Sequence, residues 1–165
     1  MDIKRLFDNN FDFAFKAATY NNIKVAIQTF EQFKKKNEDF FSFDKILLDA
    51  PCSGSGTLDA YNEASKKNFT TKLIQKSVEA QTALLKKALK VLKTGGEMIY
   101  STCSVLESEN EKVLENVLRT AKAQIVPISL DKAQFPLLDV KIPGTICVCP
   151  NEYFEGFFIA KIKKM

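Results

Sequence analysis

The stretch Lys45-Ile-Leu-Leu-Asp-Ala-Pro-Cys-Ser-Gly-Ser-Gly-Thr57 predicts both the fold and the site of this chain. Its short apolar run ends on Asp49 and turns at once to Cys52. Behind the cysteine, Gly54 and Gly56 alternate with serines, so the backbone there can adopt positive φ angles and pass close to a ligand. A buried strand that leads into such a loop is typical of an open α/β sheet, where ligands bind at the carboxyl ends of the strands. We therefore expect Asp49 and Cys52 to belong to a functional site.

Length and composition indicate a soluble globular domain. A single domain of 165 residues buries about 68–70% of the surface that its unfolded chain exposes. The apolar fraction of 45% and the charged fraction of 27% are ordinary for this class. No apolar run approaches the roughly 18 residues that a membrane-spanning helix needs, and the first residues do not form a secretory signal. We predict a cytoplasmic protein without a membrane partner.

The charge balance is compatible with a polyanionic partner such as RNA. The formal net charge is +4, and the sequence pI is about 8.8. Domains that bind nucleic acid by charge alone are usually more basic, with a pI above about 9. A solvated, lysine-rich surface explains the same excess equally well, so charge alone does not decide between the two.

The cysteines and the missing histidine limit the chemistry. The four cysteines are Cys52, Cys103, Cys147 and Cys149. A disulfide framework is not expected in a cytoplasmic chain of this size. The paired C-x-x-C spacing of a four-cysteine zinc site is absent, so we predict buried structural thiols at Cys147 and Cys149 and no metal. Because the sequence contains no histidine, Ser-His-Asp and Cys-His catalysis are excluded.

Strand and helix patterns alternate along the chain. The predicted strands are residues 23–27, 45–49, 98–100, 124–130, and a closing antiparallel hairpin made of 145–149 and 156–162. Helices are predicted over residues 72–93, ended by Thr94-Gly95-Gly96, and after Ser108 and Glu111, which have capping-box spacing. Residues 131–143 are predicted to be a loop. The alternation favours a largely parallel sheet, with strand 45–49 buried on both faces.

Cys52 and Cys103 occupy corresponding places in this predicted fold. Each follows a predicted parallel strand, residues 45–49 and 98–100, and the carboxyl ends of such strands lie at one edge of the sheet. Cys103 also precedes a predicted helix, whose N-terminal dipole would favour the thiolate. Either cysteine alone is more simply explained as a small buried residue. The pair, next to Asp49 and several hydroxyl groups, favours a function.

Five short motifs follow the opening stretch. They are Gln81-x-x-Leu-Leu85, Lys93-Thr-Gly-Gly96, Tyr100-Ser-Thr-Cys-Ser104, Glu109-Asn-Glu111 and Glu155-Gly-Phe-Phe-Ile-Ala-Lys161. In this order, and together with Asp49–Thr57 as motif IV, they resemble the Sun/Nop (RsmB-like) family of RNA cytosine methyltransferases. The resemblance covers about Phe43 to Lys163. It implies an α/β, Rossmann-like S-adenosylmethionine-dependent methyltransferase fold that closes with the antiparallel hairpin.

The resemblance also implies a reaction, the transfer of a methyl group from S-adenosylmethionine to carbon 5 of a cytosine in RNA, with ribosomal RNA favoured. Carbon 5 becomes nucleophilic when a thiolate adds to carbon 6 and forms a covalent intermediate. The family assigns this attack to the motif VI cysteine, here Cys103, and product release to the motif IV cysteine, here Cys52. Asp49 is expected to contact the base and the cofactor. DNA cytosine methyltransferases use the Pro-Cys cysteine as the nucleophile, which would exchange the two roles, but the context Tyr100–Ser104 argues against this.

One departure from the family pattern concerns the cofactor. The family's Pro-Gly-Gly-Lys loop has no counterpart in the sequence, and the acidic strand end that would bind the ribose is not identifiable. We therefore interpret residues 1–165 as part of a catalytic domain that lacks its first strands, with 1–42 as a preceding strand–helix region and 43–163 as the family-matching part. Alone, it is expected to bind S-adenosylmethionine weakly or not at all.

Two alternatives and one structural consequence follow from that interpretation. The main alternative is a truncated, non-catalytic RNA-binding module of the same family. A thiol hydrolase built on Cys52 is disfavoured by the lack of histidine. A sheet without its first strands exposes an edge, and such edges tend to pair. We expect oligomerisation or a preceding segment to cover it.

Overall fold

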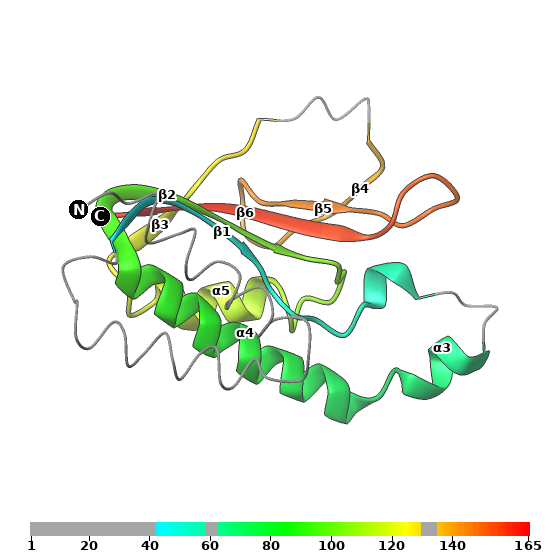
Figure 1. Cartoon of the computed structure of the whole chain (residues 1–165). Helices are drawn as coiled ribbons and strands as arrows, with labels where there is room; N and C mark the ends of the chain where they lie inside the picture. The colour runs from blue at the N-terminus through cyan, green and yellow to red at the C-terminus, as the bar shows by residue number, and fades with distance from the viewer. Residues whose placement is uncertain (1–41, 59–62, 130–134) are drawn as a thin grey trace, which may run out of the picture. The chain divides into compact units, whose positions relative to one another are not determined.

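The computed structural model describes residues 42–58, 63–129 and 135–165. The chain divides into two compact units, Met1–Ser42 and Phe43–Met165, and the second is described here (Figure 1). The predicted strand 23–27 lies outside the described residues. Within the described part, no helix has the length and apolar character needed to cross a membrane.

The second unit alternates strands and helices in its first half and consists of strands in its second. In order, the elements are β1 (Phe43–Asp49), the short 3-10 helix η2 (Ser55–Thr57), α3 (Glu63–Asn68), α4 (Thr71–Val91), β2 (Leu92–Thr102), α5 (Glu111–Leu118), β3 (Ala123–Val126), β4 (Leu137–Leu138), β5 (Ile146–Val148) and β6 (Phe157–Lys164). The strands predicted at 45–49 and 98–100 and the long helix are confirmed. The strand predicted at 124–130 is shorter, and the predicted loop 131–143 contains β4.

The strands form one mixed sheet in the order β1-β2-β6-β5-β4, with β3 also paired to β6. β1 and β2 are parallel, whereas the four other described pairings are antiparallel. The closing hairpin of β5 and β6 is confirmed, with Ile146 opposite Ile159. For the described strands, the prediction of a largely parallel sheet is wrong, because β6 runs antiparallel between β2 and β3. Hydrophobic periodicity predicts a strand but not its direction.

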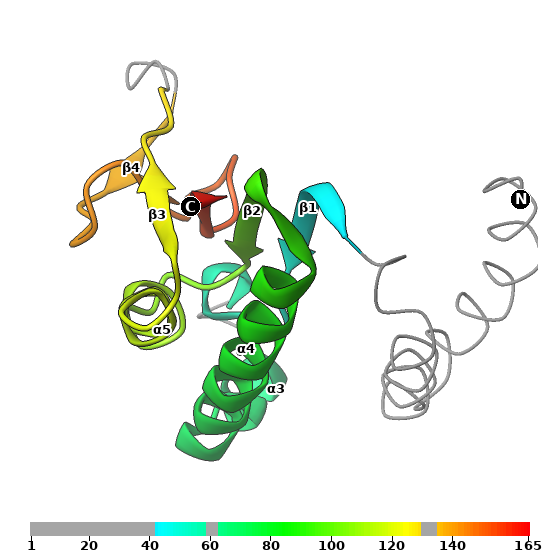
Figure 2. The ribbon, with the colours of Figure 1, turned by 90° about the vertical axis from the view of Figure 1, so that its left-hand side faces the viewer.

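The core lies between one face of this sheet and the helices α4 and α5, which pack side by side on that face (Figure 2). Its side chains come from both helices and from alternate positions of the central strands. They include Leu85 and Leu89 of α4, Val113, Leu114 and Val117 of α5, and Met98, Tyr100, Phe158, Ala160 and Ile162 of the sheet. Successive residues of a strand point to opposite faces of the sheet. Every second residue of β6 therefore faces the helices, and Phe158, Ala160 and Ile162 are fully buried there.

The opposite face of β1 is open in the described unit. Ile46 and Leu48 pack against the core, but Leu47 between them is 72% exposed. The prediction that this strand is buried on both faces is therefore wrong for the described residues. Both long helices lie on the same side of the sheet, so no described element covers the side of Leu47.

The helix ends differ from the sequence prediction in two places. α4 ends at Val91, and Gly95, although its φ is +80°, lies within β2 rather than at the helix end. The pairing of β2 with β1 shifts register at this point, and the left-handed conformation of Gly95 allows the backbone to form the irregularity. The Lys164 Nζ instead satisfies the end of α4, since it donates to the carbonyl of Leu89 in the helix and to that of Leu92, the C-cap residue. α5 begins at Glu111 with Asn110 as its N-cap, so the predicted capping box starting at Ser108 is wrong.

Candidate active site

The site lies where the parallel strands β1 and β2 end. Asp49 closes β1 and pairs in register with Ser101 of β2. The Ser101 hydroxyl donates to Asp49 Oδ1 at 2.9 Å, and the Ala50 amide donates to the Ser101 carbonyl at 2.8 Å. The hydrogen bond from Ser101 fixes the Asp49 carboxylate at the carboxyl ends of β1 and β2, although Asp49 is exposed to solvent.

The two thiols predicted for the site lie next to each other. Cys52 follows β1, Cys103 follows β2, and their sulfur atoms are 2.8 Å apart. Both residues are partly buried, and both are free cysteines. The parallel pairing of the strands accounts for this, because it places the residues after each strand at one edge of the sheet.

The environment of Cys52 favours its neutral thiol. Burial, together with the hydrogen bond to the Cys103 side chain, raises the pKa of Cys52 to about 12. Removing a thiolate from water is unfavourable, which explains the direction of the shift. At neutral pH, Cys52 therefore keeps its proton and can donate it to the Cys103 sulfur.

The predicted helix-dipole effect on Cys103 is wrong. α5 begins only at Glu111, and residues 104–110 lie between the cysteine and the helix. The influence of a helix dipole falls off within the first turn. Cys103 is held instead by the backbone around it, since its carbonyl accepts a hydrogen bond from the Gly56 amide at 3.0 Å.

A buried carboxylate connects the two cysteine loops. Glu109 is fully buried. Its Oε1 accepts from the Ser53 amide at 2.7 Å, and its Oε2 accepts from the Ser53 and Ser104 hydroxyls, each at 2.6 Å. These serines directly follow Cys52 and Cys103. The sequence indicated Glu109 only as part of a motif and gave no role for it.

A second set of hydrogen bonds fixes the segment that carries Glu109. The Thr102 hydroxyl donates to Asn110 Oδ1 at 2.6 Å, and Asn110 Nδ2 donates to the Ser104 carbonyl at 2.8 Å. The Tyr100 hydroxyl donates to the Glu109 carbonyl at 2.9 Å. Burial, with a smaller contribution from the charge of Glu109, raises the pKa of Tyr100 above its usual range. The phenol therefore stays a donor at neutral pH.

Two other contacts hold the Cys52 loop in place. Gln81 of α4 is fully buried, and its Nε2 donates to the Pro51 carbonyl at 2.9 Å. Gly56 lies against the backbone of Gly156, whose amide donates to the Gly56 carbonyl at 2.8 Å. A Cβ at Gly56 would collide with that backbone. Gly54 has the predicted positive φ, at 75°, whereas the close approach at Gly56 is to this chain rather than to a ligand.

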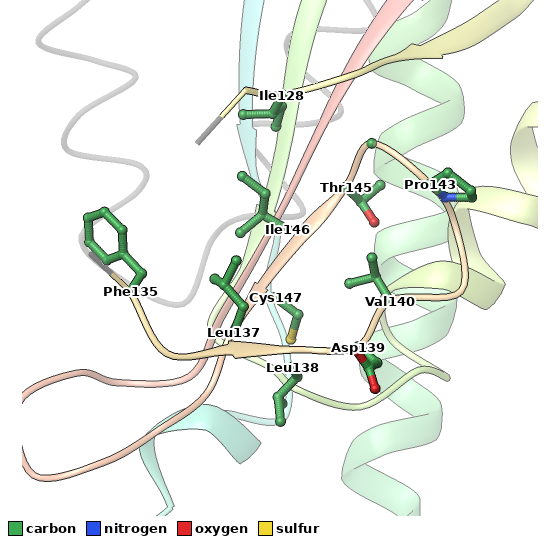
Figure 3. Close-up of a pocket in the computed structure, with 11 residues that line it drawn as sticks. Ile128, Phe135, Leu137, Leu138, Asp139, Val140, Pro143, Thr145, Ile146 and Cys147 are labelled. Atoms are coloured by element: carbon green, nitrogen blue, oxygen red, sulfur yellow. The ribbon is translucent and has the colours of Figure 1, made fainter. Parts of the chain in front are cut away.

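A separate cavity of about 710 Å³ lies beside β4 and β5 (Figure 3). Its lining includes Ile128, Phe135, Leu137, Val140, Ile146 and Cys147. Asp49 and the two thiols of the site are not among the described residues that line it. Burial raises the pKa of Cys147 to about 11, as expected for the predicted structural thiol. Cys149 is partly buried, and the described residues hold no cluster of three metal-ligating side chains.

The fold and this edge of the sheet define a class of protein, the Rossmann-like methyltransferases. A methyltransferase homolog from Pyrococcus horikoshii is 36% identical, with a TM-score of 0.62, over 79% of this chain and 42% of that one. NSun6 from the same organism, solved with SFG, is 28% identical with a TM-score of 0.64, over 79% and 32% of the two chains. The predicted α/β methyltransferase fold class is confirmed. The prediction that the first strands of this fold are missing stays a prediction, because residues 1–41 lie outside the described part.

Within this class, the chain belongs to the 16S rRNA methyltransferase RsmB/F family, whose model matches residues 8–163. The recognised resemblance is confirmed, and the match extends upstream of Phe43. Ribosomal RNA small subunit methyltransferase F of Shewanella woodyi is 39% identical over 129 residues, which are 76% of this chain and 27% of the relative. The protein of that name from Vibrio cholerae is 37% identical over 125 residues, or 74% and 26%. The chain spans about a quarter of the length of these relatives.

Proposed function

We propose that this chain contributes the thiol site of an enzyme that transfers a methyl group from S-adenosylmethionine to carbon 5 of cytosine in RNA, with ribosomal RNA as the substrate class. Membership of the family and the names of its relatives support RNA methylation. The observation that carries the cytosine chemistry is the 2.8 Å contact between Cys52 and Cys103 at the ends of two parallel strands. Carbon 5 of cytosine needs such a thiol, because it reacts only after a nucleophile has added to carbon 6.

In this proposal, Cys103 is the nucleophile. Its thiolate electron pair forms the bond to carbon 6, and the electrons of the carbon 5–carbon 6 double bond move to carbon 5. Carbon 5 then takes the methyl group, and the electron pair of the broken methyl–sulfur bond would stay with the leaving S-adenosylhomocysteine. The raised pKa of Cys52 supports this division of roles, because a sulfur that keeps its proton does not attack. The Cys52 thiol is instead a hydrogen-bond donor to the attacking sulfur.

Product release is the step assigned to Cys52. Loss of the proton on carbon 5 to solvent restores the double bond, while the bond from carbon 6 to Cys103 breaks and its electron pair returns to the sulfur. A neutral thiol 2.8 Å from that sulfur can donate a hydrogen bond to it as the negative charge develops. Cys52 then assists the release step by stabilising the leaving thiolate.

Asp49 is proposed to serve both the base and the cofactor. S-adenosylmethionine supplies an electrophilic methyl group on a positively charged sulfur, and its methionine part carries an ammonium group. The exposed Asp49 carboxylate, oriented by Ser101 beside the thiols, is chemically suited to such a cation and to the amino group of a cytosine. These contacts would orient the reactants around Cys103.

A covalent trap tests the assignment of the nucleophile. The assay uses the longest translation product that contains residues 1–165. This protein is incubated with S-adenosylmethionine and with ribosomal RNA that contains 5-fluorocytosine. Fluorine blocks the last proton loss, so the unchanged protein should accumulate a covalent RNA adduct. Cys103→Ala should abolish this adduct, whereas Cys52→Ala should form it and should also retain adduct with ordinary cytosine. An adduct formed equally well by Cys103→Ala would show that the assignment is wrong.

The alternative is that the chain is a non-catalytic RNA-binding module of the same family. The missing Pro-Gly-Gly-Lys motif favours this alternative for residues 1–165 taken alone. Isothermal titration with S-adenosylmethionine separates the two functions. Micromolar binding by the longest translation product that contains residues 1–165 supports the enzyme, whereas RNA binding by that product without cofactor binding supports the module.

A further inference from the structure

Glu109 is a buried carboxylate that the proposed reaction does not use. Burying a carboxylate is unfavourable unless hydrogen bonds replace the lost water. Glu109 is fully buried, and its carboxylate accepts three hydrogen bonds, two from Ser53 and one from Ser104. Its side chain therefore bonds the residue after Cys52 and the residue after Cys103 at the same time.

The hydrogen bonds around Glu109 run in one direction. The Ser104 hydroxyl uses its single proton to donate to Glu109 Oε2. The Ser55 and Ser104 hydroxyls are 2.8 Å apart, so Ser55 must be the donor of that pair. The Val105 amide in turn donates to the Ser55 hydroxyl at 3.0 Å. Because a carboxylate only accepts, Glu109 sets the direction of this whole chain of bonds.

The chain of bonds crosses between the loops. Ser53 belongs to the loop after β1, Ser55 begins the short helix η2 that follows it, and Ser104 belongs to the loop after β2. The Glu109 side chain bonds the serines beside the two sulfurs and neither sulfur itself, so its effect on the thiols passes through the serines. Gly56, which bonds the Cys103 carbonyl, joins the same two loops through the backbone.

We propose that Glu109 is a positioning residue that holds the Cys52 and Cys103 sulfurs at their working separation. The inference rests on the proposed function, in which both thiols serve one reaction. Glu109 replaces water as the common acceptor of the two loops. Without it, the Ser53 amide and the two serine hydroxyls lose their shared partner, and the loops are free to separate.

The direct test measures how readily the two thiols form a disulfide. The 165-residue chain is equilibrated with reduced and oxidised glutathione, so that Cys52 and Cys103 lose two electrons together and one oxidised glutathione becomes two thiols. Acid quenching, alkylation and trypsin then give linked peptides 46–66 and 94–112, which exclude Cys147 and Cys149. Their ratio to the alkylated peptides reports the effective concentration of one thiol at the other.

Glu109→Gln should lower this effective concentration about tenfold, because an amide cannot accept from all three donors. Glu111→Gln is the matched control, since Glu111 is also buried, lies two positions further along at the start of α5, and is not among the partners of Ser53 or Ser104 in the described residues. It should leave the value unchanged. Thermal unfolding followed by circular dichroism checks that each variant is folded. If Glu109→Gln does not fold, Ser53→Ala and Ser104→Ala, which each remove one hydrogen bond to Glu109, replace it.

The outcomes separate a positioning role from a purely structural one. A folded Glu109→Gln, or in its place folded serine variants, with unchanged effective concentration would overturn the proposal, as would an equal loss in Glu111→Gln. The trap experiment is independent of this measurement. If Cys103→Ala still traps RNA while Glu109→Gln shifts the thiol equilibrium, the proposed function fails and the positioning role stands. In the active enzyme, Glu109→Gln should lower kcat with little change in KM for RNA.

Discussion

The helix-covered face of the sheet and the edge that carries the thiols are held together by different forces. Beneath α4 and α5, fully buried residues such as Tyr100, Leu114 and Phe158 pack against one another. At the thiol edge, the fully buried residues include Ser104 and Glu109, which form hydrogen bonds. Apolar burial is non-directional, whereas hydrogen bonds fix distances and angles. We therefore expect substitutions in the core to lower the free energy of unfolding, and substitutions beside the thiols to change the separation of the two sulfur atoms.

Phe158→Ala should give the largest effect and tests the first half of this comparison. Phe158 is fully buried and packs edge-to-face on Tyr100, with ring centroids 6.4 Å apart. Its truncation should lower the free energy of unfolding by about 3–5 kcal/mol, measured by urea denaturation. Tyr153→Ala, at a residue that is 79% exposed, is the control, and it should change this energy by less than about 0.5 kcal/mol. Equal effects of the two changes would contradict the core assignment.

Gly56→Ala tests whether the edge can be disturbed separately from the core. The added Cβ collides with the Gly156 backbone, so the loop must move. We expect a loss of about 1–3 kcal/mol in unfolding free energy, together with a lower effective concentration of the thiols in the glutathione assay.

Gly95→Ala is the matched control for that change. Gly95 has a φ of +80° but no atom within 4 Å of an added Cβ. Only the backbone strain of a left-handed alanine is expected there, about 1–2 kcal/mol. The thiol equilibrium should not change. A shift as large as that of Gly56→Ala would show that the thiol separation simply follows overall stability.

The raised pKa of Cys52 predicts a pH dependence at the edge. The folded protein keeps this proton up to a pKa of about 12, whereas a thiol in the unfolded chain loses it near about 8.5. Between these values the folded state binds more protons, so this contribution to stability is present below the unfolded pKa and is lost as pH rises through the folded pKa. The decline should be smaller in Cys52→Ala.

Alkylation by iodoacetamide measures the same proton directly, because the thiolate is the reacting form. At about pH 8, Cys52 in peptide 46–66 should react far more slowly in the folded chain than in urea. Its rate should rise about tenfold per pH unit towards the folded pKa. Equal rates in the folded and unfolded chains at this pH would contradict the neutral thiol.

Much of the fold and the meeting of the thiols could be predicted because they depend on local patterns. An apolar run before Asp49, another before Cys103 and the helix between them indicate two parallel strands, whose ends share one edge. The direction of β6 could not be predicted, since periodicity shows which side chains face the core but not which way a strand runs. The exposure of Leu47 likewise depends on what covers its face of the sheet.

The role of Glu109 could not be predicted for a related reason. It bonds Ser53 across 56 positions of the sequence, and no local spacing marks such a contact. The helix start at Glu111 was misjudged because Ser108 and Glu111 have capping-box spacing, whereas the structure places the N-cap at Asn110. The side chain of Asn110 bonds the Thr102 hydroxyl and the Ser104 carbonyl instead of capping the helix. Tertiary hydrogen bonds at the site thus override a local helix signal.

Lys93→Ala should give the smallest change in the free energy of unfolding. It sharpens the comparison because the polar contact that it removes is exposed, unlike the buried hydrogen bonds of Glu109. Lys93 Nζ contacts both Asp44 oxygens, at 3.0 and 2.9 Å, near the other end of β1. Their side chains are 46% and 80% exposed, and such pairs contribute about 0.2–1 kcal/mol. A double-mutant cycle with Asp44→Ala in urea denaturation measures this term, and the thiol equilibrium should stay unchanged. A coupling energy above about 2 kcal/mol would contradict the view that burial, rather than the number of polar contacts, makes the thiol edge sensitive.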